Sequence, residues 1–128
     1  MLCVHNSARS QMAEGFARSM APEGVTVWSA GSQPTKLNPL AVQVMQEAGI
    51  DISGQRAKRL DEVPLDEADT IVTLCDPNEC PVVAVKVRRI HWPLDDPTAA
   101  PEAERLEAFR AARDEIRWRV SSLWPRAK

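Results

Sequence analysis

The chain has no tyrosine and few aromatic residues of any kind, two Phe and four Trp in 128 residues. No apolar run approaches the roughly 20 residues that a membrane-spanning helix needs, and the N-terminus lacks the basic and then apolar layout of a signal peptide. Positive charge is not in excess, since 16 basic residues are balanced by 18 acidic ones. We therefore expect a cytoplasmic protein that binds neither membranes nor nucleic acid, and whose anion sites are local.

Cysteine is also scarce, with Cys3, Cys75 and Cys80 as the three thiols of the chain. The cytosol keeps thiols reduced, so cysteines in a small cytosolic chain are expected to be catalytic, redox-active or metal-binding rather than a disulfide scaffold. The odd count fits a thiol relay better than a set of pairs. The length is that of one domain, and we expect residues 1–128 to form a single core that needs neither metals nor disulfides.

Helix and strand patterns alternate along the chain, without repeats or a long linker. Apolar residues at helical spacing predict helices over residues 10–20 and 39–48 and a last helix that opens at residues 101–102. Strands are predicted over residues 25–31, 70–74 and 89–92. The alternation predicts an α/β fold, with a parallel sheet covered by helices on both faces. Only Met1 and Leu2 precede Cys3, so the first strand is expected to be truncated and the natural start to lie upstream.

The strongest motif of the chain is Cys3-Val4-His5-Asn6-Ser7-Ala8-Arg9-Ser10, which lies directly before the first predicted helix. A loop of this kind wraps its backbone N–H groups, from residues 4–9, around a tetrahedral oxyanion, and the helix N-terminus adds its dipole. Arg9 can bind two oxygens of the anion. The same field stabilises the reactive Cys3 thiolate, to which Ser10 can donate. Asn6 tolerates a left-handed backbone conformation.

Outside this motif, the cysteines, acids and basic residues can each be explained by a structural role instead of a functional one. Cys75 follows a predicted strand and could be inertly buried. The two histidines and the other cysteines lack zinc-site spacing, so we predict no metal site. Asp95 and Asp96 precede Pro97, a common turn sequence. The basic stretch of Arg56, Lys58 and Arg59 is predicted to be a solvated face.

With these motifs, the chain resembles the low-molecular-weight phosphatase family and, within it, the arsenate reductase branch. The matching motifs are residues 3–14, 28–31, 71–75, 80–81 and 91–97. The resemblance implies a flavodoxin-like fold, with a four-stranded parallel sheet and the cysteine loop after the first strand. It also implies that Asp96 is the general acid that protonates the departing oxygen, a role that displacement from an oxyanion requires.

Cys75 and Cys80 distinguish the branches, because reduction of arsenate to arsenite takes two electrons, which two thiols supply by forming a disulfide. The resemblance implies that Cys75 attacks the arseno-adduct on Cys3 and that Cys80 then presents the disulfide to thioredoxin. Four residues separate this pair, fewer than in the best-known thioredoxin-coupled members, which leaves glutathione or glutaredoxin as alternative reductants. No tightly bound cofactor is implied, and a monomer is expected. The alternatives are a tyrosine or aryl phosphatase and a non-catalytic oxyanion or metalloid sensor.

Overall fold

The computed structural model describes residues 1–3, 5–74 and 87–124. Its strands are β1 (Leu2–Cys3), β2 (Ala30–Gly31), β3 (Thr70–Thr73) and β4 (Arg88–His91). They form a four-stranded sheet in the order β2-β1-β3-β4, and every pair is parallel. The predicted α/β fold with a parallel sheet is confirmed.

Three α helices connect and cover the strands: α1 (Arg9–Met20), α2 (Pro39–Glu47) and α3 (Glu102–Ser121). Each begins within about a residue of its predicted start. The clearest start signal belongs to α2, where the Asn38 side chain accepts from the N–H of Leu40 at 2.9 Å and Pro39 takes the first helical position. Gly49, with a φ of 82°, lies just after this helix.

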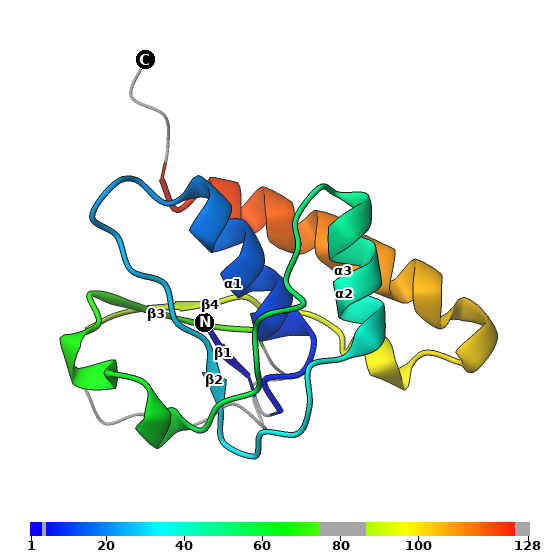
Figure 1. Ribbon diagram of the computed structural model, residues 1–128, viewed down its shortest axis with the longest axis horizontal. Helices are drawn as coiled ribbons and strands as arrows, with labels where there is room; N and C mark the ends of the chain where they lie inside the picture. The colour runs from blue at the N-terminus through cyan, green and yellow to red at the C-terminus, as the bar shows by residue number, and fades with distance from the viewer. Residues whose placement is uncertain (4, 75–86, 125–128) are drawn as a thin grey trace.

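The three α helices lie together on one face of the sheet (Figure 1). Their apolar sides enclose the main core with the sheet residues Val72 and Leu74, and its largest side chains include Phe16 of α1 and Phe109 of α3. The opposite face of the sheet carries a smaller cluster centred on Leu2 and Ile71. Adjacent residues of β3 thus point to opposite faces, as strand geometry requires.

The second face differs in detail from the prediction. Among the described residues it is covered by two short 3-10 helices, η1 (Leu60–Glu62) and η2 (Leu65–Glu67), rather than by α helices. A third, η3 (Pro97–Ala99), precedes α3. Both faces are therefore covered by helical segments, but of different kinds, because Pro64 interrupts the stretch between Arg59 and Thr70 and its aspartates favour turns over a continuous α helix.

Two strands are shorter than a typical sheet element. β1 has two residues, and β2 has two although a strand was predicted over residues 25–31. The ladder between them ends where the Met1 amino group donates to the carbonyl oxygen of Trp28 at 2.9 Å. Residues 25–29 have the composition of a strand but form none in the structure, so the prediction was wrong for this part.

Candidate active site

The site lies at the carboxyl end of β1, where the chain turns from Cys3 into helix α1. Cys3 is 3% exposed and Arg9, the first residue of α1, is 5% exposed. Ala8 occupies the N-cap position and has no side chain that could cap the helix. The first N–H groups of α1 are therefore left for an external acceptor, and these groups together with the helix dipole favour an anion there.

Asn6 fixes the shape of the loop. Its backbone is in the left-handed region, with a φ of 49°, as the sequence predicted. Its amide Nδ2 donates to the Ser10 hydroxyl oxygen at 2.7 Å, and its Oδ1 accepts from the backbone N–H of Lys58 at 2.9 Å. Gln11 Nε2 donates to both the side-chain and the backbone oxygen of Asn6, at 3.0 and 2.9 Å. The buried loop is thus held by side-chain amides.

Arg9 and Asp96 face each other across the opening of the loop. Nη1 of Arg9 donates to the carbonyl oxygen of Leu94 at 2.8 Å, which fixes the guanidinium plane, and Nη2 lies 3.7 Å from Oδ2 of Asp96. That separation is an ion pair rather than a hydrogen bond. The other oxygen of Asp96 accepts from the backbone N–H and hydroxyl of Thr98, at 3.0 and 2.7 Å. Asp96 therefore also stabilises the turn that follows it, which is the structural alternative that the sequence offered for this residue.

A small cavity of about 190 Å³ joins these groups. Its lining residues are Cys3, His5, Ser7, Ala8, Arg9, Thr35, Asp96 and Thr98. The thiol, the cation and the carboxylic acid that the sequence singled out are thus brought together in one space. Asp95, the neighbouring acid, is exposed and is not among the lining residues.

Some predicted residues lie elsewhere or outside the described part of the chain. Val4, Cys75 and Cys80 are outside it, so the relay has no described geometry. Ser10 and Asn6 are fully buried and are not among the residues that line the cavity. His5 is exposed, and its Nδ1 lies 3.1 Å from the carbonyl oxygen of Gln33.

Sequence reasoning missed the segment that covers the outer side of the loop. The backbone N–H of Thr35 donates to the carbonyl oxygen of His5 at 3.1 Å, and the backbone N–H of Asn38 donates to the carbonyl oxygen of Ser7 at 2.9 Å. Asn38 was recognised as a helix cap, but nothing in the sequence indicates that its backbone meets the Cys3 loop. Thr98 was missed as well, although a threonine two residues after an aspartate is a known capping pattern.

The basic stretch corrects one prediction. Arg56 and Arg59 are exposed, as expected of a solvated face, but Lys58 is 8% exposed and its ammonium lies 3.4 Å from the carboxylate of Glu14. The prediction was wrong for Lys58, because a backbone that pairs Arg59 with Gly31 of β2 turns this side chain inward. The local sequence carries no sign of that pairing.

Within residues 1–3, 5–74 and 87–124, no group of three or more His, Cys, Asp or Glu side chains is arranged to hold a metal ion. Over the same residues, no helix combines the length and apolar character needed to cross a membrane.

A buried cysteine at the end of a parallel strand shares one cavity with an arginine of the following helix and with an aspartate from the segment after β4, which gives an α/β protein with a candidate oxyanion site. The chain belongs to the low molecular weight phosphotyrosine protein phosphatase family, whose pattern matches residues 1–128.

Its relatives include several named arsenate reductases. The arsenate reductase of Bacillus subtilis is 45% identical over 119 residues, which cover 90% of this chain and 86% of that protein. A solved structure described as an arsenate reductase in the phosphate binding state superposes with a TM-score of 0.79 at 34% identity, over 95% of this chain and 92% of the other. The thioredoxin-dependent arsenate reductase of Corynebacterium glutamicum superposes with a TM-score of 0.63 at 26% identity, over 96% of this chain and 61% of that one.

Proposed function

We propose that this protein reduces arsenate to arsenite, with Cys3 as the nucleophile. The observation that carries the proposal is the shared cavity, in which Cys3, Arg9 and Asp96 surround a space suited to a small tetrahedral anion. The similarity to arsenate reductases over most of the chain supports arsenate as the substrate. Detoxification of arsenic is the role that this reaction would serve.

In the first step arsenate binds to the loop formed by residues 4–9, and Arg9 contacts its oxygens. The Cys3 thiolate attacks arsenic, so that a sulfur–arsenic bond forms while an arsenic–oxygen bond breaks. Asp96 gives its proton to the departing oxygen, which leaves as water. The Ser10 hydroxyl stabilises the Cys3 thiolate by donating a hydrogen bond to it. The hydroxyl hydrogen is available for this because the Ser10 oxygen already accepts from Asn6 Nδ2.

In the second step the Cys75 thiolate attacks the sulfur of Cys3. The new sulfur–sulfur bond forms as the sulfur–arsenic bond breaks, and its electron pair reduces arsenic, which leaves as arsenite. Cys80 then attacks Cys75 and frees Cys3. One observation among the described residues supports this order: the N–H of Leu74, which precedes Cys75 in sequence, donates to the carbonyl oxygen of Leu2, which precedes Cys3, at 2.9 Å.

The disulfide between Cys75 and Cys80 needs an external dithiol to complete the cycle. Thioredoxin is the proposed reductant, supported by the thioredoxin-dependent relative, with glutaredoxin or glutathione as alternatives. Such a cycle requires a reducing compartment, which favours the cytoplasm.

The same site contains what a phosphomonoester hydrolase needs, namely a thiolate, an arginine and an acid. Weak phosphatase activity on aryl phosphates is therefore part of the proposal. The chain has no tyrosine to line a pocket for an aromatic substrate, so this activity is expected to be minor.

The test is arsenate-dependent NADPH consumption in the presence of thioredoxin and thioredoxin reductase, run beside hydrolysis of an aryl phosphate. We expect turnover in the first assay and a trace in the second. Cys3→Ser is expected to abolish both, because a neutral hydroxyl is a far weaker nucleophile than a thiolate. Stoichiometric arsenic binding without turnover would instead indicate a sensor, and full activity of the variant would refute the role of Cys3.

A further inference from the structure

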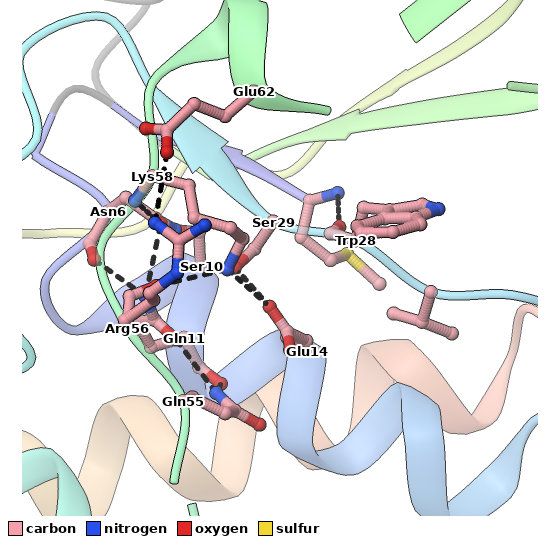
Figure 2. A network of polar contacts seen from close by, with 12 residues as sticks. Asn6, Ser10, Gln11, Glu14, Trp28, Ser29, Gln55, Arg56, Lys58 and Glu62 are labelled. Carbon is pink, nitrogen blue, oxygen red and sulfur yellow. Dashed lines mark hydrogen bonds and ion pairs between the residues drawn. The ribbon is translucent and has the colours of Figure 1, made fainter. Parts of the chain in front are cut away.

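Two charged side chains meet in the interior next to the first turns of helix α1. Lys58 is 8% exposed and Glu14 2% exposed. The Lys58 ammonium lies 3.4 Å from Oε1 of Glu14 and donates to the carbonyl oxygen of Arg56 at 3.0 Å (Figure 2). A buried charge is costly unless it is paired and hydrogen-bonded, so a pair in this position calls for a specific reason.

Both oxygens of the Glu14 carboxylate accept hydrogen bonds. The Ser29 hydroxyl donates to its Oε1, and Nε of Arg18 donates to its Oε2 at 2.9 Å. Across the described residues, no buried side-chain nitrogen or oxygen lacks a hydrogen-bond partner. The cluster is therefore a satisfied network, the kind that rigidifies its surroundings.

Lys58 is tied to the Cys3 loop through its backbone. Its N–H donates to Oδ1 of Asn6 at 2.9 Å, and its carbonyl oxygen accepts from the N–H of Gly31 in β2 at 2.9 Å. Gln11 Nε2 donates to the Arg56 carbonyl oxygen at 2.8 Å, so this oxygen is shared by Gln11 and the Lys58 ammonium. Figure 2 shows the segment from Gln55 to Lys58 passing alongside Asn6, Ser10 and Gln11.

We propose that Lys58 is a positioning residue for Cys3. Its ion pair with Glu14 holds residues 56–58 against Asn6, and Asn6 in turn holds the loop and the Ser10 hydroxyl in the arrangement that keeps Cys3 reactive. Because Asn6 donates to the Ser10 oxygen, the Ser10 proton is free to be donated to the Cys3 sulfur. Lys58 is not among the residues that line the cavity, so it acts through Asn6 rather than on the anion. The inference rests on the proposed role of Cys3 as the nucleophile.

The test is the rate at which iodoacetamide alkylates Cys3 at pH 6.5, followed by mass mapping of the Cys3 peptide because the chain has three thiols. Lys58→Met keeps the aliphatic stem and removes the ammonium. We expect the rate to fall roughly tenfold, the size of one lost hydrogen bond to a charged group. In arsenate turnover kcat is expected to fall more than KM rises, since the anion contacts stay in place.

Two variants separate positioning from charge balance. Lys58→Arg keeps a cation and is expected to recover part of the rate. Arg59→Met removes a positive charge from the adjacent residue, whose side chain is 65% exposed, and is expected to leave the rate unchanged.

Lys58→Met removes one of the two cations that pair with the buried Glu14 carboxylate and is expected to lower stability. The deciding protein is therefore the double variant Lys58→Met with Glu14→Gln, which removes both charges of this pair. We expect it to regain stability against urea while Cys3 alkylation stays slow. A wild-type rate of Cys3 alkylation in the folded double variant would overturn the inference. The same holds if Lys58→Met is less stable than the wild type but its Cys3 is alkylated at the wild-type rate. Alkylation needs no arsenate, so failure of the proposed reduction would show in the turnover assay alone.

Discussion

At the scale of single residues, Asn6 determines the shape of the site. Among the described residues other than glycine it alone has a positive φ, a conformation that asparagine tolerates better than most residues. The sequence predicts that Asn6 tolerates this backbone conformation and that its side chain makes a hydrogen bond within the loop, as it does to Ser10. Its bond to the backbone of Lys58 could not be predicted, since that residue lies 52 positions away and only the folded sheet brings it near.

The position of Asp96 predicts how the first chemical step responds to substitution. Asp96→Asn should slow formation of the arseno-adduct and flatten its pH dependence, with anion binding largely kept, because an amide cannot give up a proton to the leaving oxygen. Pre-steady-state quench measurements of the Cys3 adduct between pH 5 and 9 test this. Asp95→Asn is the matched control, because Asp95 is exposed and outside the cavity. Loss in the Asp95 variant instead would place the acid one residue earlier.

Arg9→Lys is expected to weaken anion binding, because a point charge cannot make the planar two-pronged contact and also hold the Leu94 carbonyl oxygen. Loss of one charge-assisted hydrogen bond is worth about 1.5–3 kcal/mol, so affinity should fall roughly tenfold or more. Protection of Cys3 from alkylation by inorganic phosphate gives the dissociation constant. Arg119→Lys, on the outer part of α3, serves as the control. Near-normal affinity of the Arg9 variant would argue against an oxyanion loop.

At the scale of elements, helices could be predicted closely and strands less well. The apolar periodicity of α1 and α3 is a local property, because a helix makes its backbone hydrogen bonds within itself. A strand needs a partner elsewhere in the chain, and of the strand predicted over residues 25–31 only Ala30–Gly31 pairs with β1. The same reason explains why the pairing of Arg59 with Gly31, which buries Lys58, could not be predicted.

The contact between α2 and α3 predicts a specific sensitivity to acid. Hydrogen bonds from Arg110, together with its charge and with Arg113, lower the pKa of Glu47 below its ordinary value. A carboxyl whose folded pKa is depressed adds stability above its unfolded pKa and loses it as pH falls through the folded one. The free-energy difference between wild type and Glu47→Gln, from urea unfolding, should therefore shrink as pH is lowered below about 4.3.

The control for this effect is the same Glu47→Gln substitution made in a protein that also carries Arg110→Gln and Arg113→Gln. Without the two guanidinium partners, the substitution should have no comparable pH-dependent effect. A pH-dependent difference of the same size in that background would mean that Glu47 acts through other groups.

At the scale of the whole molecule, strand order decides which distant residues share the site. The order β2-β1-β3-β4 sets β1 beside β3, so that Leu2 is in register with Thr73. Chain segments from both ends of the sequence thus form the cavity, with Cys3 and Arg9 from the first turn of the fold and Asp96 from the segment after β4. The cysteine motif predicted Cys3 and Arg9, and the family resemblance implied Asp96, but only the topology brings the three together.

The same arrangement predicts different fates for the two relay variants. Cys75→Ser should stall at the arseno-adduct, or release product only through added small thiols, because the thiol proposed to attack Cys3 is missing. Cys80→Ser should release arsenite once and then accumulate a disulfide between Cys3 and Cys75. Peptide mass mapping after one equivalent of arsenate, without reductant, distinguishes them. A stable bridge between Cys3 and Cys75 with free Cys80 in the wild type would mean that glutathione or glutaredoxin completes the cycle.

The pairing of Leu2 with Thr73 also bears on the newly made protein. Thr73 is made some 70 residues after Leu2, so the growing chain contains β1 before its neighbour β3 exists. At about 5–20 residues per second, this interval lasts several seconds or more. The thiol that is 3% exposed in the finished fold is uncovered for that time. A thiol in an unstructured chain has only an ordinary cysteine's reactivity, so Cys3 is expected to gain the reactivity proposed for it only after β3 has been made and paired.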